Sequence, residues 1–434
     1  MSERAQLALP GVALLAVLAV ATTIGPFSDV TVNDLYVYQQ YAALLHDGQL
    51  PYVDFGFEYP PLAALPLWLA GVFGRDPASI EWTFGVLMAL CLVAGQQLAA
   101  RLAGGGREGL TVAWLLVLTP VIVGASVRTH FDPLPVAIAL VGLLMLARER
   151  HDLGFLLLGL GTMTKLFPGL LAVVALVWLA GRGQWRTALR SGAVFAAVVL
   201  AISLPLAGAG YVDSFEFHLD RPVQIESTPA SVLFALGGSD VTGTNLRPDR
   251  FKSNGLDGGR ADLVEVLFAV LLVLALAAIV LLAARRRDPR HMVLCGCAAL
   301  LAFVTLGKVF SPQYVIWLAP FAALAWVWGQ RAVALLVAAA VVLTHVEFPS
   351  RYFDLINVQT DVVVIVGMRN GLLLAALGVL AVSLMRRPAR AQSPVPGGTA
   401  TAPAGMTPPD ADPAPPPRPR ADRADPGAGR LRQR

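Results

Sequence analysis

Residues 262–287 read DLVEVLFAVLLVLALAAIVLLAARRR, and this stretch decides the class of fold. Nineteen consecutive residues within it, 266–284, carry no charge. An α-helix needs about 20 mainly apolar residues to cross the hydrocarbon core of a bilayer. The three arginines that follow are typical of the cytoplasmic end of such a helix. The stretch therefore predicts a transmembrane helix.

The composition of the whole chain agrees with a membrane location. Of the 434 residues, 56% are hydrophobic and 14% are charged, whereas about 25% charged residues is usual in a soluble domain. The mean hydropathy of +0.65 excludes disorder outside the C-terminal tail. The net charge of +4 indicates no nucleic acid partner, because the cations lie in short loops between apolar runs.

Further apolar segments resemble this one. Together they predict an all-α polytopic membrane protein with a bundle of about twelve transmembrane helices, in which shorter spans are shielded by their neighbours. The predicted spans are residues 7–25, 80–100, 110–125, 131–147, 153–164, 166–181, 187–207, 262–284, 291–306, 313–328, 331–345 and 362–385.

Basic residues predict the orientation, because arginine and lysine in short loops stay in the cytoplasm. All the basic clusters fall on that side only if residues 60–74 do not cross the membrane. This segment carries Pro60, Pro61 and Pro66, whose rings disrupt a helix, so we expect an interfacial or re-entrant helix on the outer side. The clusters are Arg101 with Arg107, Arg148 with Arg150, Arg182 with Arg186 and Arg190, Arg285–Arg287 with Arg290, Arg331, and Arg386 with Arg387.

This topology divides the chain into a transmembrane domain, residues 1–386, and a tail, residues 387–434. The domain carries a first outer loop, 26–79, and a large outer loop, 209–261. The tail is a low-complexity run of Pro, Ala, Gly, Arg and Asp, which predicts a disordered cytoplasmic segment. Nearly all polar residues that are capable of chemistry fall on the predicted outer face.

Acidic and aromatic residues form the first group of candidates. Asp34 could accept a proton from a sugar hydroxyl, or Asn33 or Asp34 could open a short helix as its N-cap. Residues 51–61, PYVDFGFEYPP, alternate carboxylates with aromatic rings. This pattern is typical of sugar binding, and an aromatic belt at the level of the lipid headgroups is the alternative. The binding candidates here are Tyr38, Tyr52, Asp54, Glu58 and Tyr59.

Cations at outer helix ends form the second group. Lys165 interrupts an apolar region, and Lys308 repeats the arrangement in residues 307–314, GKVFSPQY. A cation at the membrane edge is costly and indicates function, with phosphate as the expected partner, whereas snorkelling to the headgroups is the alternative. His130 is a possible ligand or base, or a buried histidine of the bundle. The remaining binding candidates are Arg128, Asp132, Ser311, Gln313 and Tyr314.

Several common sites are missing from the sequence. We find no P-loop, HExxH or EF-hand pattern, and the three cysteines lie in apolar stretches without a disulfide or metal spacing. We therefore expect no cofactor and assign no metal ligands. The acidic residues of the first outer loop are nevertheless of a type that can bind a divalent ion, so a metal requirement stays open. The energy for a reaction must come from the substrate.

Four motifs together resemble glycosyltransferase family 87, over about residues 7–385. They are Asn33-Asp34-Leu35-Tyr36-Val37-Tyr38, Gly48-x-x-Pro51-Tyr52-x-Asp54-Phe55-x-x-Glu58-Tyr59-Pro60-Pro61, Lys165-x-x-Pro168, and Phe310-Ser311-Pro312-Gln313-Tyr314-x-x-Trp317-x-x-Pro320. The second and fourth motifs are the more specific ones.

The resemblance implies a GT-C class enzyme that takes a sugar from a polyprenyl phosphate. Typically this is an α-1,2-mannosyltransferase of bacterial cell-envelope glycolipids, such as phosphatidylinositol mannosides or lipomannan. It further implies an active site on the outer face of the plasma membrane, inversion at the anomeric carbon, and a catalytic aspartate in the first outer loop, which Asp34 matches. We expect the donor phosphate near Lys165, Lys308 or Arg128, and the sugar to be oriented by Glu58 with Tyr59.

Two alternatives stay open. A lipid flippase or transporter could bind the same polyprenyl phosphate without chemistry, but it needs polar residues along a transmembrane path rather than at one edge. The second alternative is the same class of enzyme with arabinofuranose or glucose as the donor sugar, since the loop motifs do not decide the sugar.

Overall fold

The structure, a computed structural model, describes residues 3–237 and 254–386. The predicted tail, 387–434, and part of the predicted large outer loop lie outside these residues. Within them the regular secondary structure is helical apart from two short strands, β1 (Val223–Gln224) and β2 (Gly255–Leu256), which pair antiparallel. The described chain therefore has the all-α class that the sequence predicts.

Helices occupy all the segments that the sequence predicts as spans. Many begin with a proline in the first turn, where its missing N–H group would have no helical partner. The helices are α1 (Glu3–Ala21), α5 (Pro77–Leu102), α6 (Gly106–Leu116), α7 (Thr119–Val123), α9 (Pro133–Ala147), α10 (His151–Thr164), α11 (Pro168–Gly181), α12 (Trp185–Ser203), α16 (Gly259–Ala283), α17 (Pro289–Leu306), α18 (Val315–Val327), α19 (Arg331–Glu347) and α21 (Thr360–Met385).

Six helical segments of the described chain are long and apolar enough to cross a membrane. The other apolar helices, such as α9 and α11, have 10–17 residues, so the predicted number of about twelve spans is not confirmed. An all-α membrane protein fits the structure. The six segments are Pro77–Leu102, Gly106–Val123, Trp185–Leu206, Gly259–Ala283, Pro289–Leu306 and Thr360–Met385.

The helices differ in how deeply they are buried. In the most apolar 18-residue stretch of α17, 83% is buried inside the protein, whereas the corresponding share is 22% in α16 and 6% in α12. Helix α17 therefore lies in the core, where it packs with α9, α11 and α18 in one continuous apolar cluster. Many apolar side chains of helices α12 and α16 are exposed, as is expected for helices that contact lipid.

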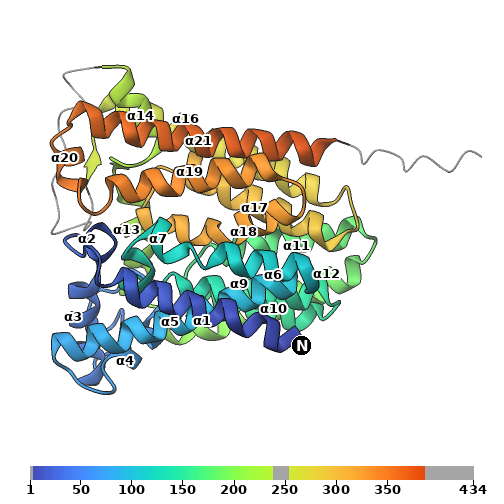
Figure 1. Cartoon of the computed structure of the whole chain (residues 1–434), viewed down its shortest axis with the longest axis horizontal. Coiled ribbons are helices and arrows are strands. Elements are labelled where there is room, and N and C mark those ends of the chain that lie inside the picture. The colour runs from blue at the N-terminus through green and yellow to red at the C-terminus, as the bar shows by residue number, and fades with distance from the viewer. Residues whose placement is uncertain (1–2, 238–253, 387–434) are drawn as a thin grey trace, which may run out of the picture. The chain divides into compact units, whose positions relative to one another are not determined.

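The short helices gather at one end of the long ones (Figure 1). At the left of the figure lie α2 (Gly25–Ser28), α3 (Leu35–His46), α13 (Ala209–Asp220) and α20 (Tyr352–Ile356). The N-terminus and the end of α21 lie at the right. Residues from the connections predicted to be cytoplasmic pair with one another, as in Arg182 with Glu149 and Arg290 with Glu108, each at 2.9 Å.

The proline-rich segment after residue 60 forms the 3₁₀ turn η1 (Pro61–Ala63) and the helix α4 (Ala64–Ala70). Together they are too short to cross a bilayer. Leu67 and Ala70 of α4 are fully buried in a cluster with residues of α3 and α5. The segment therefore packs against α3, the helix that begins after Asp34 and contains Tyr38. Its place relative to the membrane stays a prediction.

Candidate active site

The first outer loop is built around packed aromatic rings. Tyr41 of α3 packs edge-on against Phe57 at a centroid distance of 5.0 Å, and Tyr52 lies 5.6 Å from the same ring. The Tyr59 ring packs against Phe131 at 5.0 Å. Tyr52 and Phe57 are almost fully buried. These rings therefore support the loop from within, and they connect it to the start of α9.

Asp34 occupies the N-cap position of α3, but its carboxylate does not cap the helix. The Asn33 side chain does so instead, because its Oδ1 accepts a hydrogen bond from the Leu35 N–H at 2.7 Å. The Asp34 Oδ2 lies 3.6 Å from the His130 Nε2 and accepts a hydrogen bond from the Tyr38 hydroxyl at 3.4 Å. With 34% of its side chain exposed, Asp34 can meet a ligand.

A buried ion pair lies next to His130. The Lys165 Nζ is 2.7 Å from the Asp132 Oδ1, and 12% and 0% of the two side chains are exposed. The Trp317 indole N–H donates to the same Asp132 oxygen at 2.5 Å, and Lys165 donates to the Gln313 Oε1 at 3.3 Å. The Asp132 Oδ2 is buried without a hydrogen-bond partner among the described residues.

Aromatic rings surround the Lys165 ammonium. The centroids of Phe131, Trp317 and Tyr314 lie 4.8, 5.6 and 5.9 Å from the Nζ atom. Ring faces attract a cation, and more strongly when water is excluded. The amine therefore points into the protein, so snorkelling to the headgroups does not describe Lys165.

The other predicted cations have their own partners. Arg128, on the short helix α8 (Ser126–Thr129), lies 3.5 Å from Glu81 and donates to the Ser28 carbonyl at 3.3 Å. Lys308 pairs with Glu265 of α16 at 2.8 Å and donates to the Leu219 carbonyl at 2.5 Å. None of the contacts found for Lys308 is shared with Lys165. Lys308 fastens its loop to α13 and α16.

Three of the predicted binding residues have local structural contacts. The Asp54 carboxylate accepts a hydrogen bond from the Leu50 N–H at 2.7 Å within its own turn. The Tyr52 hydroxyl donates to the Tyr59 carbonyl. The Ser311 hydroxyl accepts a bond from the Gln313 amide at 3.0 Å, which turns the Gln313 oxygen towards Lys165. These residues shape the loops that hold the others.

Glu58 and Tyr59 lie between α3 and α13. The Tyr41 hydroxyl is 3.5 Å from the Glu58 Oε2, and the His218 Nε2 of α13 is 2.9 Å from the Glu58 carbonyl oxygen. Burial, with the nearby charges of Asp34 and Glu58, holds the pKa of Tyr59 well above its ordinary value. Tyr59 is therefore a neutral hydroxyl that can donate a hydrogen bond.

Helix α13 and the residue that follows it supply His218 and Arg221, which the sequence analysis does not name. Burial, with the positive charges of Arg221 and Lys165, lowers the pKa of His218. The charge of Arg221 also acts on Tyr314. The charges of Arg221 and Lys165 thus both act on the His218 ring. The signal in the sequence is faint, because SFEFHLDRP carries no known motif.

The depressed pKa of His218 predicts a loss of stability on acidification. The folded protein binds a proton here less readily than the unfolded chain, whose histidine has a pKa of about 6.5. Stability therefore falls as the pH drops below that value towards the lower pKa of the folded state. We expect the melting temperature to fall between pH 7 and 5, and to fall less in His218→Gln, which removes the titrating ring. An equal decline in both proteins would contradict this assignment.

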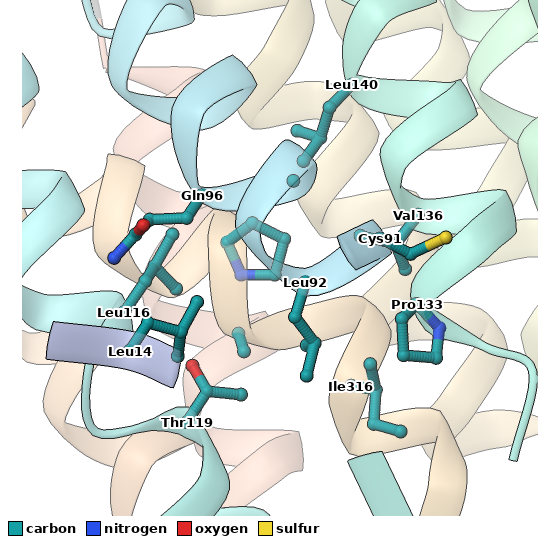
Figure 2. Close-up of a pocket in the computed structure, with 13 residues that line it drawn as sticks. Leu14, Cys91, Leu92, Gln96, Leu116, Thr119, Pro133, Val136, Leu140 and Ile316 are labelled. Carbon is teal, nitrogen blue, oxygen red and sulfur yellow. The ribbon is translucent and has the colours of Figure 1, made fainter. Parts of the chain in front are cut away.

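Figure 2 shows a mainly apolar pocket between the helices, and two of its lining residues are sequence neighbours of the charged cluster. Pro133 directly follows Asp132, Ile316 directly precedes Trp317, and both line the pocket. Leu14, Cys91, Leu116 and Val136 are among its other walls, and the pocket is narrow, with a cavity volume of about 30 Å³.

Among the described residues, no group of three or more His, Cys, Asp or Glu side chains could hold a metal ion. The three cysteines are free and buried. The arrangement instead provides a part-exposed carboxylate, a buried cation and an adjoining apolar pocket.

Residues 57–312 match glycosyltransferase family 87. The chain belongs to this family. It is therefore a membrane glycosyltransferase, and the resemblance seen in the motifs is confirmed at this level. The matched region includes Glu58, Lys165 and Lys308, but it begins after Asp34. No curated protein matches the chain.

Proposed function

We propose that this family 87 enzyme transfers mannose from polyprenyl-phosphate mannose to a glycolipid or glycan of the bacterial cell envelope. The transfer inverts the anomeric carbon and takes place at the outer face of the plasma membrane. One observation carries the proposal: the Asp34 carboxylate lies 3.6 Å from His130, and Asp132, two residues further along, pairs with the buried Lys165 ammonium beside the start of the apolar pocket.

We propose that Asp34 acts as the general base. It takes the proton from the acceptor hydroxyl as the oxygen bonds to the anomeric carbon, and the bond from that carbon to the phosphate breaks. His130, 3.6 Å away, orients the carboxylate. The His130 Nδ1 is itself held by the Thr129 hydroxyl at 3.0 Å. We assign Glu58 and Tyr59 to bind hydroxyl groups of the donor or acceptor sugar.

The donor phosphate is proposed to bind at Lys165. A fixed cation in a site without water stabilises the negative charge that grows on the leaving phosphate. Arg221 adds positive charge on the side of α13, and Gln313 and Tyr314 complete the rim. The polyprenyl chain then enters between α5, α9 and α18, along the pocket of Figure 2.

We also propose a GT-C-like bundle in which the shorter helices cross the membrane together with the six long ones. Helices in the centre are shielded by their neighbours, so they need fewer apolar residues than a lone span. In this arrangement residues 1–386 form the transmembrane domain, with the loops 26–79 and 209–261 outside and residues 387–434 in the cytoplasm.

A donor panel tests the proposal. The purified protein is given labelled mannose, arabinofuranose or glucose on polyprenyl phosphate, and mannose on a nucleotide, with a glycolipid acceptor. We expect product from polyprenyl-phosphate mannose and none from the nucleotide sugar. If product formed only from another lipid-linked sugar, the proposal that mannose is the donor sugar would be refuted. Binding of every lipid carrier without any product would favour a flippase.

A further inference from the structure

A second group of charged residues is buried outside the proposed site. Arg369 of α21, Glu347 at the end of α19 and Glu226 after β1 have 0%, 0% and 1% of their surface exposed. None of them belongs to the motifs that the sequence analysis singles out. Charged groups inside a membrane protein are costly and are retained where they have a function.

The Arg369 guanidinium contacts four groups. The Nη1 lies 3.8 Å from the Glu347 Oε2, and the Nη2 donates to the Glu226 carbonyl oxygen. The Nε donates to the Asn370 Oδ1 at 3.2 Å. The face of the group lies 3.9 Å from the centroid of the Phe310 ring. A planar, delocalised cation is required for this combination of stacking and donation.

These contacts join two segments that are far apart in the sequence. The Asn370 amide also donates to the Glu226 carbonyl at 3.2 Å and to the Ser231 hydroxyl at 2.8 Å. The Gln224 N–H donates to the Lys308 carbonyl at 2.9 Å. The segment 224–231 and the loop 308–314 are thus held on the same side chains of α21.

A continuous set of rings leads from Arg369 to the site. Phe310 lies 6.3 Å from Tyr314, and Tyr314 stacks on Trp317 at 4.1 Å. Trp317 donates to Asp132, the partner of Lys165. A change in the position of Phe310 must therefore reach the environment of the Lys165 ammonium, because packed rings have little room to absorb it.

Arg369 meets the two acids in different ways. Burial and the charge of Glu347 raise the pKa of Glu226 well above its ordinary value. The Arg369 guanidinium lies near the Glu347 carboxylate and over the Phe310 ring. Its contact with Glu226 is to the backbone carbonyl, which fixes the chain rather than a charge.

We propose that Arg369 is a positioning residue, which holds Phe310 so that Gln313, Tyr314 and Trp317 form the wall around Lys165. The expected effect of Arg369 on turnover rests on the proposed function. The expected change in the surroundings of the Lys165 ammonium does not depend on which substrate the enzyme uses.

The protein has three lysines, Lys165, Lys252 and Lys308, and this makes the test direct. Lysine labelled with ¹³C at Cε gives few signals, and the signal of Lys165 is identified by its loss in Lys165→Arg. We compare Arg369→Lys and Phe310→Leu with Arg351→Lys, a control in the outer segment whose arginine pairs with Asp354 and Asp361. Folding is followed by the melting temperature, and transfer by kcat.

We expect the Lys165 signal to move in Arg369→Lys and Phe310→Leu and to stay in Arg351→Lys. We also expect about a tenfold fall in kcat in the first two, and no further fall when they are combined, because residues that act as a unit are not additive. An unmoved Lys165 signal in folded Arg369→Lys overturns the proposal, as do effects that multiply. A moved signal in a protein that transfers no sugar refutes the proposed function and leaves the positioning role standing.

Discussion

Replacing Asp34 with asparagine is expected to lower the turnover of sugar transfer about a thousandfold, as the loss of a general base does. Asparagine keeps the shape of the side chain but cannot take a proton. The fold should persist, because α3 is capped by Asn33 and not by Asp34. The melting temperature and the binding of the lipid donor should therefore match the wild type, while kcat falls.

Asp54→Asn is the matched control for this experiment. It makes the same chemical change in the same loop, where the carboxylate only accepts a hydrogen bond from Leu50, and an asparagine oxygen can accept that bond. We expect near-normal transfer from this variant. The roles of the two residues would be reversed if Asp54→Asn were inactive and Asp34→Asn retained turnover.

Replacing Lys165 with methionine is expected to remove both activity and stability. It leaves the Asp132 carboxylate fully buried without its cation. Breaking a buried ion pair by removing one partner costs about 3–5 kcal/mol. A large drop in melting temperature, measured in detergent, should therefore accompany the loss of transfer.

The double variant Lys165→Met with Asp132→Leu separates stability from function. Apolar side chains in place of a buried ion pair are often neutral or stabilising, so the melting temperature should recover. Transfer should not recover, because the proposed phosphate-binding cation is still missing. An active double variant would show that Lys165 serves folding alone.

The sequence predicts the helices well because their apolar runs are long and are separated by arginine, proline and glycine. The boundaries of α16 and α21 differ from the prediction by a few residues at most. The number of spans is harder to predict, since α9 and α11 are too short to qualify by length and depend on burial against other helices. That burial is a property of the tertiary structure.

The site is predicted unevenly for a similar reason. Motifs in the sequence single out Asp34 and Lys165, but they do not show that Lys165 pairs with Asp132, 33 residues away. His218 and Arg369 lie in stretches with no motif, and only packing brings them near the candidate residues. Lys308 shares its local pattern with Lys165, yet its amine is directed to Glu265.

The most direct test of the account is the transfer of radiolabelled mannose from synthetic polyprenyl-phosphate mannose to a glycolipid acceptor by the purified protein and by Asp34→Asn. We predict labelled glycolipid with the wild type and a loss of at least about a hundredfold with the folded variant. Equal product from both proteins would remove Asp34 from its role. Carrier binding without product from any lipid-linked sugar would contradict the proposed chemistry.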